Sequence, residues 1–338
     1  MGNTKNKILV TGAEGFVGTA LIGELLVAGK SQIYGLRKPS SELETGHKPD
    51  VKMLAGDISE YESLKDLEKL EDFKTVVHTA GLAHQFGGTL REDFWRVNVR
   101  GTENICRMAG KIGASHFILI SSVSVYGDQG NVEIDESFDC RPAGDYAESK
   151  LASENAAIEF CERHDVGLTI LRIGTVIGEG DRGNTARLIT TIDKNRFFWI
   201  GDGSNKKSLI YKGDAAEGIC RAIENGTANG TEIYNLTAPA IQMSEVVEAI
   251  SLNLKKKPLP FRIPESFVRM VLSITKSGIS PKRLRRVERT LEKWLSNDIF
   301  SGGKFCEKFG FEMRTPIAEA LARQVKFYLD SKGKVIRR

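Results

Sequence analysis

Tyr146 and Lys150 are the side chains of this sequence whose types and spacing best suit proton transfer. They stand four residues apart in the run Tyr-Ala-Glu-Ser-Lys, a spacing that places both on one face of a helix. A tyrosine hydroxyl ionises near pH ~10, which is too high for a base at neutral pH. Because a nearby ammonium favours the phenolate, Lys150 would bring Tyr146 within range as a proton acceptor or donor.

A strand end that precedes this pair carries further hydroxyls. Residues 121–127 read Ser-Ser-Val-Ser-Val-Tyr-Gly and follow an apolar run. The Tyr-Lys spacing alone is common by chance, and its place after such a strand makes it specific. Ser122 would either bind the substrate or cap its own backbone, and capping is the better interpretation for Ser121.

A glycine loop follows the first predicted strand and reads Thr-Gly-Ala-Glu-Gly-Phe-Val-Gly over residues 11–18. A pyrophosphate needs close backbone approach and free N–H groups at a helix N-terminus, which Phe16 and Val17 would begin. Gly12 and Gly15 lack the β-carbons that would block this approach, and Gly18 allows tight packing of helix on strand. The loop predicts a dinucleotide site, although a plain glycine turn between strand and helix is the alternative.

The elements around these residues alternate between short β-branched runs and longer helical patterns. This alternation predicts an α/β fold, a Rossmann-type doubly wound parallel sheet. The predicted strands are 8–10, 33–36, 51–54, 75–78, 117–120 and 168–171, and the predicted helices are 16–28, 61–70, 93–112 and 146–164.

The pattern changes after about Arg172 to loops, short helices and isolated strands at 208–211 and 232–236. We predict a dinucleotide-binding domain over 1–172, to which 208–240 returns. A smaller substrate-binding subdomain would comprise 173–207 and 241–338. Within it, 316–329 has the pattern of an amphipathic helix, and 332–338 is expected to be a mobile basic tail.

Composition narrows the class of protein. The 338 residues are 41% hydrophobic, enough for a large core, and the net charge of +4 favours small anionic ligands over nucleic acid. The five cysteines are widely spaced without a C-x-x-C pair, which argues against a disulfide framework and a metal site. With no signal segment and no long apolar run, we expect a cytoplasmic protein without an integral membrane segment.

Taken in order, these motifs make the sequence similar to the extended short-chain dehydrogenases, the epimerase/dehydratase family of nucleotide-sugar enzymes. The resemblance runs from Ile8 to beyond Asp214. It implies that Asp57, with Ile58, follows the third strand beside the adenine, and that Thr79, Ala80 and Gly81 line the cofactor. It also implies that Asn98 lies beside the active site.

The same resemblance assigns the hydroxyl four residues before Tyr126, that of Ser122, to the substrate, with Ser124 close by. Tyr146 and Lys150 become the catalytic pair, and both also contact the cofactor, whose positive nicotinamide ring would further favour the phenolate. The 4,6-dehydratases of the family carry an Asp-Glu pair where this chain has Val123 and Ser124. Elimination would lack its acid and base, so dehydration is disfavoured.

The cofactor is predicted to be NAD or NADP. At the end of the second strand, where an NAD enzyme usually has an acidic residue, this chain has Arg37 and Lys38. These cations would suit the 2′-phosphate of NADP, or they are simply solvated at the strand end.

On the substrate side, Asn184 lies in the stretch resembling the diphosphate loop, and Lys207 stands where the family has a phosphate-binding arginine. A lysine neutralises phosphate without the bidentate fork of arginine. His84 is a candidate for contact with the sugar, or else structural. The basic stretch between Phe267 and Trp294 reads by default as a solvated helix face.

The resulting prediction is hydride transfer at carbon 4 of a UDP-hexose or UDP-N-acetylhexosamine, by a 4-epimerase or a 4-ketoreductase. The alternatives are a hydroxysteroid or dihydroflavonol type of dehydrogenase and a non-catalytic protein that senses the cofactor. Members of the family often form a homodimer through a helix pair, here the predicted helices 93–112 and 146–164.

Overall fold

The computed structural model describes residues 6–39, 50–83, 89–227, 229–258, 261–264, 266 and 295–336. His84 and the basic stretch from Phe267 to Trp294 lie outside the described residues.

A seven-stranded sheet forms the centre of the molecule, with the strand order β11-β6-β5-β4-β1-β2-β3. Every neighbouring pair is parallel, which confirms the predicted doubly wound α/β fold. The strands are β1 (Asn6–Thr11), β2 (Ser31–Arg37), β3 (Val51–Ala55), β4 (Phe73–His78), β5 (His116–Ser122), β6 (Gly167–Ile173) and β11 (Thr231–Leu236).

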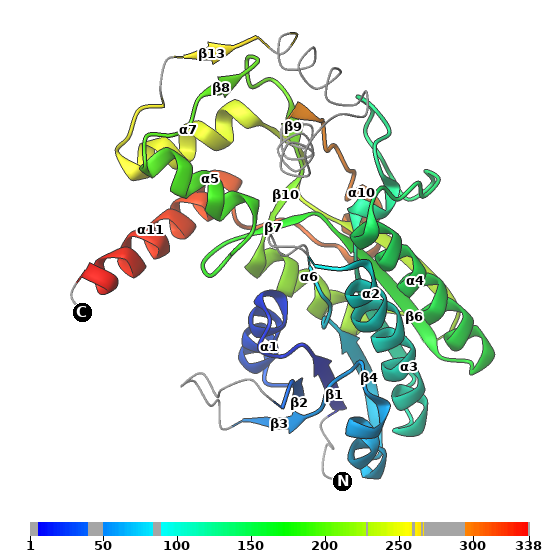
Figure 1. The fold of residues 1–338 in the computed structure, drawn as a ribbon. Helices are drawn as coiled ribbons and strands as arrows, with labels where there is room; N and C mark the ends of the chain where they lie inside the picture. Colours follow the sequence, from blue (N-terminus) through cyan, green and yellow to red (C-terminus); the bar gives the residue numbers. More distant parts are fainter. Residues whose placement is uncertain are drawn as a thin grey trace.

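Helices cover both faces of this sheet (Figure 1). Alternate residues of β1 show the two layers, because Ile8 and Val10 enter one apolar core while Leu9 enters the other. The first core is closed by α1 (Phe16–Ala28), α6 (Lys212–Asn225) and α10 (Gly303–Phe309), and the second by η1 (Tyr61–Lys69), α3 (Gly101–Lys111) and α4 (Asp145–Arg163).

The helix predicted over 93–112 consists of three parts. A short α2 (Arg91–Phe94) leads into a π-helical segment, η2 (Trp95–Arg100), before α3 begins. Segments of π-helix are rare and often lie at functional sites. The predicted helix at 61–70 is also corrected, since η1 is a 3-10 helix.

A third apolar core lies between α5 (Asn184–Asp193), α7 (Met243–Leu254) and α11 (Ile317–Ile336), beyond the carboxyl ends of the strands (Figure 1). The predicted mobile tail is wrong in its first part, because the helix continues through Lys332 to Ile336. The remaining short elements are η3 (Val123–Tyr126), which follows β5 directly, and β7 (Thr175–Ile177), β8 (Trp199–Ile200), β9 (Lys206–Lys207), β10 (Leu209–Tyr211), β12 (Ile241–Gln242) and β13 (Arg262–Ile263).

His116 makes the stability of the sheet sensitive to acid. Its Nε2 lies 2.9 Å from Thr169 Oγ1, and burial lowers its pKa to about 4, with Glu232 opposing the shift and Lys74 adding to it. The unfolded chain takes up the proton near pH ~6.5. Between that pH and about 4 the unfolded state therefore binds more protons, so the free energy of unfolding falls as the pH falls.

We expect His116→Gln to reduce this loss by about 1–2 kcal/mol between pH ~6.5 and pH ~5, because the glutamine does not titrate. Urea denaturation at a series of pH values measures it, with the exposed His164→Gln as the matched control. Identical pH slopes for the wild type and His116→Gln would contradict the assignment.

Candidate active site at the carboxyl edge of the sheet

The predicted chemical groups meet where β1, β4 and β5 end, at the edge where open α/β sheets bind ligands. The segment after β4 is tied to the end of β1, because Thr79 Oγ1 donates to the carbonyl of Thr11 at 2.6 Å and the Ala80 N–H donates to Thr11 Oγ1 at 3.2 Å. His78 is buried beneath them and its Nδ1 lies 2.7 Å from the same hydroxyl. Burial lowers the pKa of His78 to about 3, helped by Lys150, so this histidine is a neutral structural group.

The glycine loop forms a cradle that side chains would fill. Gly12 has φ +67°, and a β-carbon there would lie 2.8 Å from Ala80. A β-carbon on Gly15 would lie 3.0 Å from the carbonyl oxygen of Gly12. Gly15 is also the N-cap of α1. Because it has no side chain, no cap covers the backbone N–H groups at Phe16 and Val17, which are open to an anion. These features fit the pyrophosphate of a dinucleotide.

Gly18 is the most restrictive position of the loop, because a β-carbon there would lie 2.2 Å from the Gly12 carbonyl oxygen. We expect Gly18→Ala to push the loop away from α1 and to weaken cofactor binding on the order of a hundredfold. Titration of NADH fluorescence, after removal of any bound NAD, measures this affinity. Gly303→Ala is the matched control, because its β-carbon meets only Ser301 Oγ at 3.4 Å. Equal affinities for the two variants would rule out the cradle.

Tyr146 lies in the first turn of α4 and contacts Ser122 at the end of β5. Burial raises the pKa of Tyr146 above its usual value, and the hydrogen bond with Ser122 opposes this rise. In the protein alone the tyrosine therefore favours its neutral form. A lowered pKa requires added positive charge, which a bound oxidised nicotinamide would supply.

Lys150 is buried one turn after Tyr146 and donates to the carbonyl of Ile120 at 2.6 Å. Burial lowers its pKa to about 8, while the carboxylate of Glu154 opposes the shift. A β-carbon on Gly81 would lie 4.0 Å from its Nζ, so the ammonium also borders the segment after β4. The side chain of Lys150 thus extends from α4, which we call the catalytic helix, toward the segment after β4 that is predicted to line the cofactor.

Glu154 and Arg172 form a buried ion pair behind Lys150, which the sequence analysis did not assign to the site. Arg172 Nη2 lies 2.7 Å from Glu154 Oε2, and the two side chains are 6% and 1% exposed. Ser121 donates a hydrogen bond to the same carboxylate. The only sequence signal was the spacing, because Glu154 follows Lys150 by four residues and shares its helix face.

Asn98 lies in the π-helical segment and is 2% exposed. Its Oδ1 accepts from the Leu82 N–H at 2.7 Å, and its Nδ2 donates to the Leu82 carbonyl at 3.1 Å and to Ser149 Oγ at 2.9 Å. The side chain therefore holds the segment after β4 against α4. This geometry makes Asn98 a positioning residue.

The two serines after β5 differ in their partners. Ser122 Oγ accepts the Ser124 N–H at 3.2 Å, so this hydroxyl caps η3 as well as contacting Tyr146. The hydroxyl of Ser124 is buried and makes no hydrogen bond within the described part of the chain. A buried hydroxyl without a partner is costly, and a polar ligand atom would satisfy it.

The residues predicted around the adenosine end are held by ion pairs. Lys38 Nζ lies 3.2 Å from Asp57 Oδ2, and Arg37 Nε lies 3.9 Å from Glu14 Oε1. Burial raises the pKa of Asp57, but hydrogen bonds from Ser59 and the Lys38 ammonium outweigh it, so the carboxylate stays ionised. Ile58 is buried, and a β-carbon on Gly101 would lie 2.8 Å from its side chain.

The two predicted phosphate contacts, Lys207 and Asn184, lie in β9 and at the start of α5. Lys207 Nζ donates to Asp298 Oδ2 and to the Ser296 carbonyl, both at 2.8 Å, so a phosphate would compete with this ion pair. Asn184 is exposed at the first turn of α5. There Asp181 accepts the Gly183 N–H at 2.6 Å, which places a carboxylate at the helix start.

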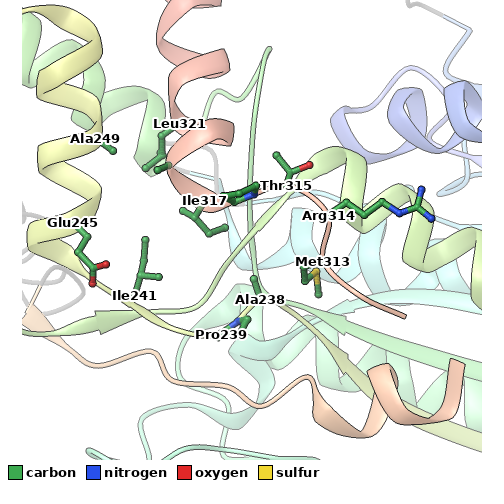
Figure 2. A pocket seen from close by; sticks show the side chains of 12 residues that line it. Ala238, Pro239, Ile241, Glu245, Ala249, Met313, Arg314, Thr315, Ile317 and Leu321 are labelled. Atoms are coloured by element: carbon green, nitrogen blue, oxygen red, sulfur yellow. The ribbon is translucent and has the colours of Figure 1, made fainter. Parts of the chain in front are cut away.

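A separate pocket of about 310 Å³ lies between α7 and α11 (Figure 2). It is lined by Ile241, Glu245, Arg314 and Leu321 among others, and none of its lining residues belongs to the predicted site. Within the described ranges no group of three or more His, Cys, Asp or Glu side chains could hold a metal ion. None of the described helices is both long and apolar enough to cross a bilayer.

Comparison with known proteins is decisive for the family. The model of the NAD dependent epimerase/dehydratase family matches residues 8–237, a range that includes the glycine cradle and the Tyr146–Lys150 pair. The chain belongs to this family. Its members are NAD-dependent enzymes, which confirms the predicted enzyme class and nicotinamide cofactor.

The individual relatives of this chain differ in their enzymatic activity. An Escherichia coli O157:H7 protein, N-acetyl-alpha-D-glucosaminyl-diphospho-ditrans,octacis-undecaprenol 4-epimerase, is 32% identical over 77% of this chain and 76% of its own. A dTDP-D-glucose 4,6-dehydratase from Mus musculus is 27% identical over 70% of this chain and 69% of its own. The UDP-glucuronic acid 4-epimerase of Bacillus cereus, solved with NAD, shares the fold with a TM-score of 0.75 at 19% identity, over 96% and 99% of the chains.

Proposed function

We propose that the protein is a 4-epimerase that acts on a UDP-linked hexose or N-acetylhexosamine. The contact between Tyr146 and Ser122 at the carboxyl edge of the sheet, with Lys150 buried alongside, is the observation that carries the proposal. This cluster supplies a proton acceptor beside a segment suited to a nicotinamide cofactor. NAD, when bound, supplies an acceptor and donor of hydride.

Each group of residues would have one role in the epimerisation. Gly12, Gly15 and Gly18 admit the pyrophosphate to the start of α1. Tyr146 takes the proton of the 4-hydroxyl and later returns it, while Ser122 fixes the same oxygen by a hydrogen bond. In a 4-epimerase, hydride leaves one face of carbon 4 and returns to the opposite face. The 4-keto sugar therefore has to turn in the site between the two half-reactions.

Other reactions of this family fit the site less well. Dehydration needs an acid and a base at positions 123 and 124, where the structure has a buried valine and the unpartnered hydroxyl of Ser124. A cofactor-sensing protein would not need the Tyr146–Lys150 pair. A steroid-type dehydrogenase would need no polar groups in the stretch from 183 to 214.

A second candidate keeps the sugar chemistry and changes the carrier to a polyprenyl diphosphate. The ion pair between Lys207 and Asp298 does not distinguish the two carriers, because both are diphosphates, so the support comes from a relative. The relative that is 32% identical is named for such a lipid-linked sugar.

The test uses the purified full-length protein without added cofactor. Denaturation should release near-stoichiometric NAD, and the native protein should interconvert UDP-N-acetylglucosamine and UDP-N-acetylgalactosamine. An empty protein that oxidises NADH or NADPH with a 4-keto sugar would instead identify a ketoreductase. Failure to bind any nicotinamide cofactor would overturn the proposal. Turnover only of an undecaprenyl-diphosphate sugar would favour the second candidate.

We also propose a homodimer formed through α3 and α4 in the cytosol. The free cysteines of the described chain are compatible with a reducing compartment. The domain division at residue 172 likewise stays a proposal, supported by the separate core around α5, α7 and α11.

A further inference from the structure

Exposed apolar side chains gather at one end of the molecule. Of the eight large hydrophobic residues that the structure shows exposed within the described ranges, five lie in α7, in α11, in the turn after α5 or directly before β13. They are Phe198, Leu252, Phe261, Phe327 and Leu329. Figure 1 shows α5, α7, β8 and β13 together at the end away from the N terminus.

A shared core and specific contacts bring these segments together, because Phe197 and Leu254 enter the same apolar core. Asp193, at the end of α5, accepts hydrogen bonds from Tyr328 at 2.9 Å and Lys332 at 2.5 Å of α11. The backbone N–H of Trp199 donates to the Phe261 carbonyl at 3.1 Å, which holds the segment of Phe198 and Trp199 beside that of Phe261 and Arg262. We call residues 194–199, 252–258 and 261–262 the basic-aromatic surface.

The charge of the basic-aromatic surface is strongly positive. It holds Lys194, Arg196, the run Lys255–Lys257 and Arg262, and no acidic residue interrupts these segments. Two carboxylates interact with these cations: a hydrogen bond from Lys332, with a smaller effect of Lys256, lowers the pKa of Asp193, and hydrogen bonds from Ser204, with a smaller effect of Arg262, lower that of Asp202. Arg262 also lies 5.9 Å from the Trp199 ring.

From this juxtaposition we propose that the basic-aromatic surface docks the protein on an anionic lipid bilayer. Exposed phenylalanine and leucine tips enter the boundary of the acyl chains while flanking ammonium and guanidinium groups meet lipid phosphates. A protein partner fits less well, since lysine is depleted at protein interfaces. The proposal stands apart from the epimerase assignment, although docking would place the enzyme beside a lipid-linked substrate.

Co-sedimentation of the full-length protein with vesicles tests this inference. The protein should bind vesicles of phosphatidylcholine with phosphatidylglycerol, and it should bind pure phosphatidylcholine far less. The triple variant Lys255→Gln, Lys256→Gln, Lys257→Gln should weaken binding on the order of a hundredfold, about fivefold for each charge. Phe198→Ala with Phe261→Ala should weaken it on the order of tenfold or more.

Matched controls remove the same groups elsewhere. Lys30→Gln, Lys65→Gln, Lys69→Gln deletes three exposed charges, and Val27→Ala with Leu90→Ala deletes two exposed apolar side chains. Both controls should bind like the wild type. Failure of the wild type to bind the anionic vesicles, or equal losses in the variants and controls, would overturn the proposal. Because vesicle binding is the readout, the result is independent of whether the enzyme proves to be an epimerase.

Discussion

Replacing Tyr146 with phenylalanine is expected to lower kcat by about a thousandfold, the middle of the range for loss of one positioned acid–base group. The ring of Tyr146 also packs against Phe94, with centroids 6.0 Å apart, and phenylalanine keeps this contact. What disappears is the hydroxyl that bonds Ser122 and moves the proton. Cofactor affinity should change by less than about threefold, because the cradle is untouched.

Single-turnover kinetics on a UDP-sugar, together with NADH titration, separate the two effects. Tyr61→Phe serves as the control, because it removes a hydroxyl that bonds Glu68 on η1. It should leave kcat unchanged. Undiminished turnover in Tyr146→Phe would exclude this residue as the acid–base group.

Breaking the buried ion pair is expected to have the largest effect on stability. In Arg172→Met the carboxylate of Glu154, 1% exposed, loses the guanidinium that bonds it at 2.7 Å and 3.1 Å. An unpaired buried charge typically costs about 3–5 kcal/mol, so the free energy of unfolding should fall by that amount. The Arg172 guanidinium also lies 4.8 Å from the Tyr126 ring, and this contact is lost as well.

Urea denaturation at neutral pH measures the change, and two further variants locate its cause. The double variant Arg172→Met, Glu154→Leu should recover much of the loss, since the carboxylate that lost its guanidinium is removed as well. Arg163→Met breaks the exposed pair with Glu159 and should cost less than about 1 kcal/mol. A comparable loss in Arg172→Met and Arg163→Met would contradict the role of burial.

The sheet and the glycine cradle were predictable because local sequence determines them. Runs of β-branched residues predict the strands, and the spacing of the glycines at positions 12, 15 and 18 predicts the dinucleotide loop. The π-helical segment η2 could not be predicted, because the spacing of apolar residues over 93–112 fits an α-helix and a π-helix equally well. The π conformation goes with the hydrogen bonds of Asn98 to Leu82 and Ser149, which lie 16 and 51 residues away in the chain.

Long-range pairing also explains what sequence reasoning missed in the site. Lys207 was predicted to contact a phosphate, and sequence reasoning did not find its partner Asp298, which lies 91 residues further on. The pair of Glu154 and Arg172 joins a helix to a strand, and neither residue belongs to a motif that shows the other. The end of α11 was misjudged for a similar reason, since Lys332 in the expected tail binds Asp193.

The hydrogen bonds of Asn98 have a consequence for local unfolding. One side chain fastens the segment after β4 to Ser149 of α4, within the turn that separates Tyr146 from Lys150. Neither segment can open without breaking the bonds of the other, so the two form one cooperative unit. A ligand that orders the segment after β4 would therefore also restrain the catalytic helix. The catalytic helix would then be held most firmly while the cofactor is present.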